Sequence, residues 1–288
     1  MTVNIASAQY DISFLQDWQA YQSKIECWVS EAAGQNAQIL VFPEYGSMEL
    51  ASLFGKDIYS SLSKQLLAMQ EVREDYIKLY QTLAQRHQCY IQAGTFPVSI
   101  ADGVYRNRAY FFWPDGQFDY QDKMMMTRFE NEQWLIQGGV ELKCFTTEYG
   151  KIAINVCYDS EFPILARKQV EMGANLILVP SCTDTVAGYH RVRIGCQARA
   201  LENQCYVVQS PTVGQAPWSE AVDENIGAAA IYTPVDRGFP DNGILAMGEL
   251  NQSQWVYAQL SLSACATVRE QGQVFNYRDW PLQFAHLS

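Results

Sequence analysis

The apolar residues of this chain form short strand-like runs that alternate with longer runs of helical spacing. Strands are predicted at residues 3–10, 37–45, 89–99, 151–162, 175–181 and 205–214, and helices at residues 17–37, 64–88, 162–174 and 190–204. Residues 105–123 predict a hairpin that turns at Pro114, Asp115 and Gly116. Repeated strand–helix–strand units together with a hairpin predict an α/β protein with mixed sheets covered by helices.

Composition supports one globular body. Of 288 residues, 48% are hydrophobic and 18% charged, and no repeat, low-complexity tract or long linker divides the chain. We therefore expect a single domain over residues 1–288, with a core of about 4–262 and a C-terminal extension at 263–288. The net charge of −11 disfavours nucleic acids and anionic membranes as partners, and favours small molecules.

The first residues resemble no secretory signal, and no stretch holds eighteen uninterrupted apolar residues. We expect a soluble, cytoplasmic protein. The eight cysteines form no CxxC pair, which predicts neither a zinc site nor a redox dithiol. We expect free thiols, no metal and no organic cofactor.

Three of the predicted strands are apolar along most of their length but carry a polar or reactive residue at the end. These residues are Glu44, Lys123 and Cys157. Each has an ordinary explanation when taken alone, as a loop acid, a surface lysine or a buried thiol. Strand ends are also where catalytic groups gather over a rigid sheet. A thiol nucleophile needs a base to take its proton and a cation to hold its charge.

The ordered set FPE, DK, a glutamate before an aromatic residue, and VCYDSEFP resembles the nitrilase (carbon–nitrogen hydrolase) superfamily, in its amidase-like branch. SAQ at residues 7–9, GANLILVPS at 173–181 and RALENQCYVV at 199–208 follow the same pattern. The resemblance covers about residues 4–250, and its motifs carry weight because they occur together and in order.

The resemblance implies that Cys157 is the nucleophile, Glu44 the general base and Lys123 the electrostatic stabiliser. The ammonium of Lys123 and the backbone N–H of Tyr158 would face the oxyanion that forms when the thiolate attacks. The abrupt strand end would push the sulfur into a crevice, as nucleophile elbows do. The nearby Asp159 would then point elsewhere.

The resemblance also implies a second glutamate shortly before an aromatic residue. Glu130 lies four residues before Trp134 and Glu132 two before it, and although both spacings occur in the superfamily we favour Glu132. We expect Asp159 and Glu161 to pair with cations such as Arg167.

The walls of the pocket are predicted less sharply. Tyr45 and Trp134 are candidate pocket aromatics, although half-burial is their ordinary explanation. Cys182 begins a loop that lines the site in similar folds, although a small buried residue is the favoured interpretation. Residues 124–126 are three methionines where many relatives are more polar, which predicts either a flexible pocket wall or, with better support, ordinary core packing.

The implied fold is a four-layer αββα sandwich, and the implied assembly is a homodimer or higher homo-oligomer. The aromatic-rich stretch 268–284 would suit burial against a neighbouring subunit or against its own. The implied reaction is hydrolysis of a small linear amide through a thioester. The same residues would serve a nitrile or an N-carbamoyl substrate, or acyl transfer to an acceptor other than water. An inert scaffold protein is the remaining alternative.

Overall fold

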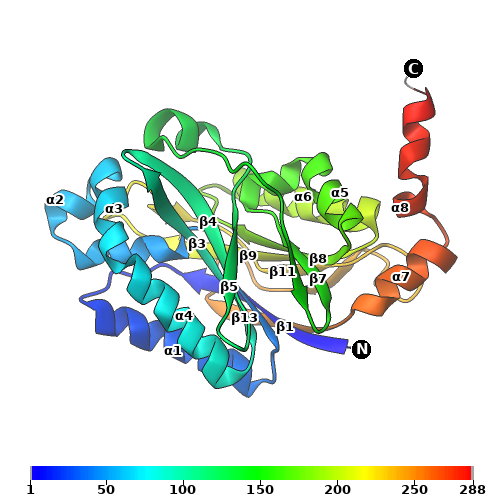
Figure 1. The fold of residues 1–288 in the computed structure, drawn as a ribbon, viewed down its shortest axis with the longest axis horizontal. Helices are drawn as coiled ribbons and strands as arrows, with labels where there is room; N and C mark the ends of the chain where they lie inside the picture. Colours follow the sequence, from blue (N-terminus) through cyan, green and yellow to red (C-terminus); the bar gives the residue numbers. More distant parts are fainter. Residues whose placement is uncertain (1, 287–288) are drawn as a thin grey trace.

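The computed structural model describes residues 2–286, with strands in the middle and helices outside them (Figure 1). The elements of the first half are β1 (Thr2–Asp11), α1 (Trp18–Gly34), β2 (Ile39–Phe42), the 3₁₀ segment η1 (Gly46–Leu53), α2 (Lys56–Tyr59), α3 (Leu62–Met69), η2 (Gln70–Val72), α4 (Arg73–His87), β3 (Tyr90–Ala101), β4 (Val104–Phe112), β5 (Phe118–Asp122) and the π-helical turn η3 (Glu130–Trp134).

The second half continues the alternation and ends in a helical tail. Its elements are β6 (Cys144–Thr147), β7 (Gly150–Ile154), the 3₁₀ turn η4 (Cys157–Glu161), α5 (Pro163–Glu171), β8 (Ala174–Ser181), α6 (Val186–Asn203), β9 (Tyr206–Gln215), β10 (Glu224–Asn225), β11 (Ala230–Tyr232), β12 (Ile244–Met247), β13 (Gln254–Ser261), α7 (Leu262–Gln271), α8 (Asn276–Asp279) and η5 (Trp280–His286).

The strands form two sheets that meet at one corner. One has the order β5-β4-β3-β2-β1 and the other β9-β8-β7-β6, with β13 added antiparallel beside β1. The β1–β2–β3 and β7–β8–β9 pairings are parallel, whereas β3–β4–β5 and β6–β7 are antiparallel. Strands β1 and β9 pair only at Tyr10 with Thr212 and Asp11 with Val213. The predicted mixture of parallel and antiparallel pairing is confirmed.

Alternation along β1 explains the layers. Ala6, Ala8 and Tyr10 belong to a buried cluster with side chains of α1 and α4, whereas Val3 and Ile5 belong to a second cluster that includes β8 and β9. Successive side chains of a strand face opposite sides, so one face of this sheet packs on helices and the other on the second sheet. The second cluster continues onto α5 and α6. The predicted four-layer αββα sandwich is confirmed.

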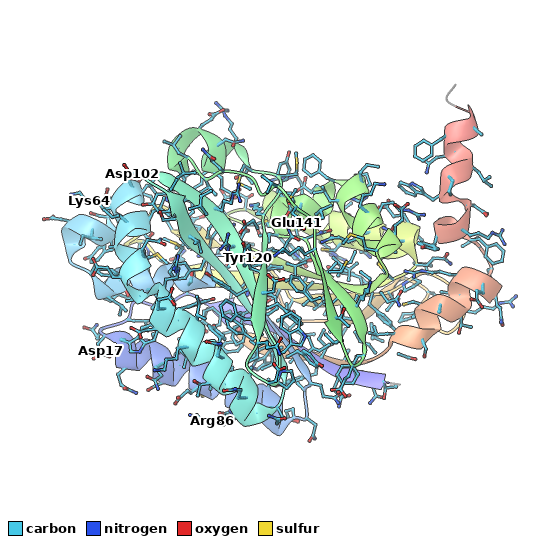
Figure 2. The ribbon with its side chains drawn as sticks, in the orientation of Figure 1. Asp17, Lys64, Arg86, Asp102, Tyr120 and Glu141 are labelled. Atoms are coloured by element: carbon cyan, nitrogen blue, oxygen red, sulfur yellow. The ribbon has the colours of Figure 1, made fainter. Side chains whose placement is uncertain are left out.

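Side-chain caps fix where two long helices begin. Asp17, labelled in Figure 2, accepts a hydrogen bond from the backbone N–H of Ala20 at 2.8 Å and starts α1. The Thr185 hydroxyl accepts one from Gly188 N at 3.0 Å. Helix α6 therefore begins at Val186, four residues before the predicted start. The prediction missed these residues because it was based on the helical spacing and not on the cap.

The hairpin appears at the expected place, and so do the predicted strands except the one at 151–162, which ends at Ile154 and is followed by the 3₁₀ turn η4. Strands β4 and β5 pair antiparallel, and the turn closes with Gly116 N donating to Trp113 O at 2.9 Å. The predicted helix at 64–88 is divided into α3 and α4 by η2. Strands β10 to β13 lie beyond residue 214, where the last predicted strand ended, so none of them was predicted.

The C-terminal extension forms α7, α8 and η5, and its last helix stands away from the sandwich (Figure 1). Its base is held by Arg167, whose guanidinium donates to the carbonyl of Tyr277 at 3.1 Å and lies over that ring. Leu282 and Phe284, nearer the end, are exposed. Within residues 2–286 we find no helix with the length and apolar character needed to cross a membrane.

Candidate active site

Three strand ends bring Glu44, Lys123 and Cys157 together. Glu44 follows β2 after a proline, Lys123 directly follows β5, and Cys157 lies three positions beyond the last residue of β7. The Lys123 ammonium donates to Glu44 Oε1 at 2.7 Å, and the Cys157 thiol lies within hydrogen-bonding reach of the Glu44 carboxyl. None of the three is more than 4% exposed.

Two sharp backbone turns aim these side chains. Cys157 has a φ of +48° and Tyr45, next to Glu44, a φ of +56°. This left-handed conformation costs a non-glycine residue on the order of 1 kcal/mol, so the surrounding structure must hold it. Strand β7 is buried up to Ile154, and the turn then takes the Cys157 side chain out of the sheet toward a cavity.

The acid that contacts Lys123 is Glu130, and the preference for Glu132 was wrong. Glu130 is buried and accepts from Lys123 Nζ at 2.7 Å. The Glu132 side chain is 56% exposed and pairs with Arg128 at 2.8 Å. The physical reason is the wide π-helical turn, which buries its first and last residues, Glu130 and Trp134, and leaves those between them outside.

Glu130 is surrounded by donors. Oε1 accepts from the Tyr45 hydroxyl at 2.7 Å, and Oε2 accepts from both the backbone N–H and the hydroxyl of Thr127 at 2.9 Å. Burial alone would raise the pKa of Glu130, but the bonds from Lys123, Tyr45 and Thr127 bring it below the ordinary value. Glu130 is therefore the permanently ionised partner of Lys123.

Glu44 is tuned in the opposite direction. Burial raises the pKa of Glu44, and the charge of Glu130 adds to this effect, although Lys123 opposes it. Burial disfavours the Lys123 ammonium, yet Glu130 and Glu44 together raise the pKa of Lys123 well above its usual value. Two carboxyl groups whose pKa values are pushed apart are suited to different tasks, one as a fixed charge and one as a proton carrier.

The sulfur is kept as a thiol in the resting site. Burial and the nearby Glu44 charge raise the pKa of Cys157 well above that of a free thiol, with Lys123 acting against them. The thiol also points at the carbonyl oxygen of Cys182, at 3.7 Å. Because the Glu44 carboxyl lies near the sulfur, the thiol proton can pass to it when negative charge is transferred onto a bound electrophile.

These groups open into a cavity of about 340 Å³. Its lining includes the three predicted wall residues and the predicted oxyanion donor, together with the Glu44–Lys123–Cys157 set and Glu130. The wall residues are Tyr45, Trp134 and Cys182, and the donor is Tyr158. Trp134 and Tyr45 pack with ring centroids 4.9 Å apart. Seven carboxylates and three basic side chains line the cavity, so it is electronegative.

The three methionines do not line this cavity. Met126 packs on the core beside the helices, in agreement with the favoured core-packing prediction, whereas Met124 and Met125 use their backbone N–H groups to bind Asp159. Asp159 was not predicted to bind these groups. The sequence did contain one signal for this role: Asp159 lies two residues after the Cys157 thiol, and a carboxylate buried there needs hydrogen-bond donors.

Asn107 was also missed. It comes from β4, is fully buried, and its amide donates to Glu44 Oε1 at 2.8 Å. The polar residue inside the YRNRAYFF strand was the available signal, since a buried amide requires partners.

Of the expected pairing of Asp159 and Glu161 with cations such as Arg167, the choice of Arg167 and the pairing of Asp159 were wrong, whereas Glu161 does face a cation. Arg167 pairs with Glu171 one helical turn along α5, at 2.9 Å, because both lie on one helix. Glu161 faces Arg191 of α6 at 3.7 Å. In residues 2–286, no group of three or more His, Cys, Asp or Glu side chains could hold a metal ion.

Solved structures define the class of this fold. Saccharomyces cerevisiae Nit3, a member of branch 10 of the nitrilase superfamily, superimposes with a TM-score of 0.76 at 22% identity, over 93% of each chain. A mutant of the amidase from Nesterenkonia sp. AN1, with the acetamide moiety of fluoroacetamide on its active-site cysteine, gives a TM-score of 0.74 at 18% identity over 99% of this chain and 96% of that one. The architecture is that of the nitrilase superfamily.

Residues 4–270 match the family model of the carbon–nitrogen hydrolases, and the chain belongs to that family. The probable hydrolase YhcX of Bacillus subtilis is 35% identical over 286 residues, which are 99% of this chain and 55% of YhcX. The chain thus spans about half the length of this relative.

Proposed function

We propose that the protein hydrolyses the C–N bond of a small linear amide through a thioester on Cys157. The convergence of Glu44, Lys123 and Cys157 on one cavity is the observation that carries this proposal. The Nesterenkonia amidase, which shares this fold, takes covalent addition at its active-site cysteine, and this supports a nucleophilic role for Cys157. The cavity, at about 340 Å³, suits a small substrate.

The first half-reaction follows from the pKa directions. As the sulfur attacks the amide carbon, its proton passes to Glu44, and the carbonyl oxygen becomes an oxyanion facing the Lys123 ammonium and the Tyr158 backbone N–H. Glu44 then gives the proton to the departing nitrogen, the C–N bond breaks, and an amine or ammonia leaves. The thioester remains on Cys157.

The second half-reaction uses the same groups. Glu44, ionised again, takes a proton from water, and the hydroxide attacks the thioester carbon. The C–S bond breaks, the sulfur recovers the proton, and a carboxylate leaves. Throughout, Glu130 keeps its charge and holds Lys123 as an ammonium ion, because its pKa is lowered while that of Glu44 is raised.

The test of this function is ammonia release from a panel of simple amides, ω-amides, N-carbamoyl compounds and nitriles. Cys157→Ala should lower the rate on the best substrate by at least about 10⁴-fold, while the melting temperature changes little. Cys27→Ala, which removes an exposed thiol, is the matched control and should keep full activity. Activity that survives in Cys157→Ala would refute the thioester mechanism.

We further propose that the enzyme acts in the cytoplasm as a homodimer or a larger homo-oligomer. Exposed apolar side chains on α6 and on the C-terminal tail, Ile194, Leu201, Leu282 and Phe284, support an assembly that covers them. Light scattering coupled to gel filtration tests this, and a monomer at micromolar concentration would contradict it.

A further inference from the structure

The catalytic groups come from two different sheets. Glu44 and Lys123 follow β2 and β5 of the first sheet, whereas Cys157 follows β7 of the second. In residues 2–286, strand pairing connects these sheets only through the two residue pairs between β1 and β9. The spacing between the Lys123 ammonium and the Cys157 sulfur therefore has to be fixed by contacts outside the strand ladders.

Each catalytic loop is anchored to its own half of the molecule. Lys123 N donates to the carbonyl of Asn107 at 2.9 Å, and Gly139 N donates to the carbonyl of Lys123 at 2.7 Å. On the other side, Asn155 N donates to the carbonyl of Leu178 in β8 at 2.9 Å. These bonds position each loop on its sheet, but they do not connect the two loops.

Asp159 makes that connection. Oδ1 accepts from Met125 N at 2.7 Å and Oδ2 accepts from Val156 N at 3.0 Å, while Met124 N is shared between them, at 3.1 Å from Oδ1 and 3.2 Å from Oδ2. Met124 is the residue after Lys123, and Val156 is the residue before Cys157. The side chain is fully buried, so these bonds are shielded from water.

The character of these bonds indicates a positioning role. Burial raises the pKa of Asp159 to about 7, with the Lys123 charge and the three backbone N–H groups acting against that rise. Within the described chain, every hydrogen bond to this carboxylate comes from a backbone N–H group, and none from a basic side chain. A carboxylate bonded in this way fixes main-chain positions, here on both sides of the site.

We propose that Asp159 is a positioning residue that clamps the Lys123 loop to the Cys157 turn and so sets the distance between the ammonium and the sulfur. This inference rests on the proposed function. Lys123 stabilises the thiolate and the oxyanion, and the hydrogen bonds of Asp159 between the two sheets hold Lys123 in the place where it can do so. Loss of these bonds should therefore affect the chemical step more than substrate binding.

The test is Asp159→Asn, which keeps the shape but offers one acceptor oxygen. Its amide N–H₂ must replace either Oδ1, which bonds Met125 N, or Oδ2, which bonds Val156 N. Met124 N can donate to the remaining oxygen in either case, so the hold on one of the two loops is weakened. We expect kcat on the best amide of the panel to fall about 10- to 100-fold, with KM changed less than about threefold. The pH dependence of Cys157 alkylation by iodoacetamide should move to higher pH, because a displaced Lys123 stabilises the thiolate less.

The matched control is Asp236→Asn. Asp236 is also largely buried and accepts from backbone N–H groups, from Arg237 at 2.7 Å and Gln273 at 2.9 Å, but it lies outside the cavity lining. It should lower the melting temperature without changing kcat or the alkylation profile. Should Asp159→Asn not fold, as judged by circular dichroism, Asp159→Ser takes its place, since it leaves room for water where the carboxylate lay.

The outcomes separate the two proposals. If the wild-type protein releases ammonia from no compound of the panel, the proposed function fails and the inference fails with it. If the wild type is active and the Asp159 variant matches the Asp236 variant in kcat and in its alkylation profile, the function stands and the positioning role is overturned.

Discussion

Residues 2–286 contain two clusters in which a lysine bonds a buried glutamate beside a tyrosine, and only one of these two clusters borders the candidate active-site cavity. The Lys123 cluster comprises Glu44, Tyr45, Lys123 and Glu130, and the Lys24 cluster comprises Tyr10, Lys24 and Glu49. In both, the ammonium bonds a buried carboxylate, at 2.7 Å in the first and 2.8 Å in the second. In both, a tyrosine hydroxyl donates to a carboxylate.

The difference lies in what surrounds the pair. Lys123 has two carboxylates at 2.7 Å, whereas the second acid near Lys24, Asp11, is 3.9 Å away and partly exposed. Burial raises the pKa of Glu49 as it does that of Glu44, so a raised carboxyl pKa does not by itself identify a catalytic group. The Lys123 cluster alone has an excess carboxylate, a thiol within reach and an open cavity.

The largest effect should come from making the same change in both clusters. Glu44→Gln removes the proposed base and should lower kcat about 10²- to 10⁴-fold. Glu49→Gln keeps the hydrogen-bonding shape in the Lys24 cluster and should leave kcat unchanged, while lowering the melting temperature. Steady-state ammonia release and thermal melts measure both, and equal losses of kcat would remove the distinction between the clusters.

The pKa of Glu44 also predicts how kcat/KM declines at acidic pH. The base must be ionised to accept the thiol proton, so kcat/KM falls as pH drops through the pKa of Glu44. Because burial raises that pKa above the ordinary value of 4.5, activity should begin to fall at a higher pH than a solvent-exposed glutamate would give. A limb centred below 4.5 in the pH profile of kcat/KM would contradict this assignment.

The next effect should follow from removing each ammonium. Lys123→Met leaves two buried carboxylates without a cation, so we expect kcat to fall about 10²- to 10³-fold and the stability to fall by about 3–5 kcal/mol. Lys24→Met should destabilise less, since the Lys24 side chain is 15% exposed, and should leave kcat intact. Urea denaturation alongside kinetics separates these two results.

A smaller effect is expected from the two neighbouring acids. Glu130→Gln removes the negative charge that holds the Lys123 ammonium in place. It should lower kcat about tenfold or more, because a less well held ammonium stabilises the oxyanion less. Glu132→Gln removes only an exposed pair with Arg128 and should change kcat by less than about twofold. The reverse order of effects would restore Glu132 as the supporting acid.

The smallest predicted effect concerns the charge of the substrate. The Lys123 cluster lies at the electronegative cavity and the Lys24 cluster does not, so only the first should respond to substrate charge. Among 4-aminobutyramide, butyramide and succinamate, which are similar in size, kcat/KM should decrease in that order, by about tenfold from first to last at low salt. The spread should narrow as salt is added. Fastest turnover of succinamate would show that a basic side chain of the wall binds the carboxylate instead.

The sequence predicted the parts of the fold and site that depend on patterns along the chain. The alternation of strands and helices, the hairpin at Gly116, and the strand ends that carry Glu44, Lys123 and Cys157 all follow from residue order. The family resemblance supplied the layered sandwich, which one chain's periodicity cannot specify.

The errors arose where a side chain's direction depended on three-dimensional detail. Whether Glu130 or Glu132 faces inward depends on a π-helical turn, and both have plausible spacing in the sequence. The role of Asp159 was hidden because its partners are backbone N–H groups, which are present at nearly every residue and leave no mark in the sequence. Asn107 joined the site from a strand that the sequence treated only as half of a hairpin.

The raised pKa of the Cys157 thiol bears on how the enzyme survives oxidants. Peroxide reacts with thiolates far faster than with thiols, and the first product, a sulfenic acid, leads to irreversible damage on further oxidation. A sulfur that remains protonated until an electrophile enters the cavity is a poor target for hydrogen peroxide. The substrate-free enzyme should accordingly tolerate oxidising conditions that inactivate enzymes whose cysteine is ionised at rest.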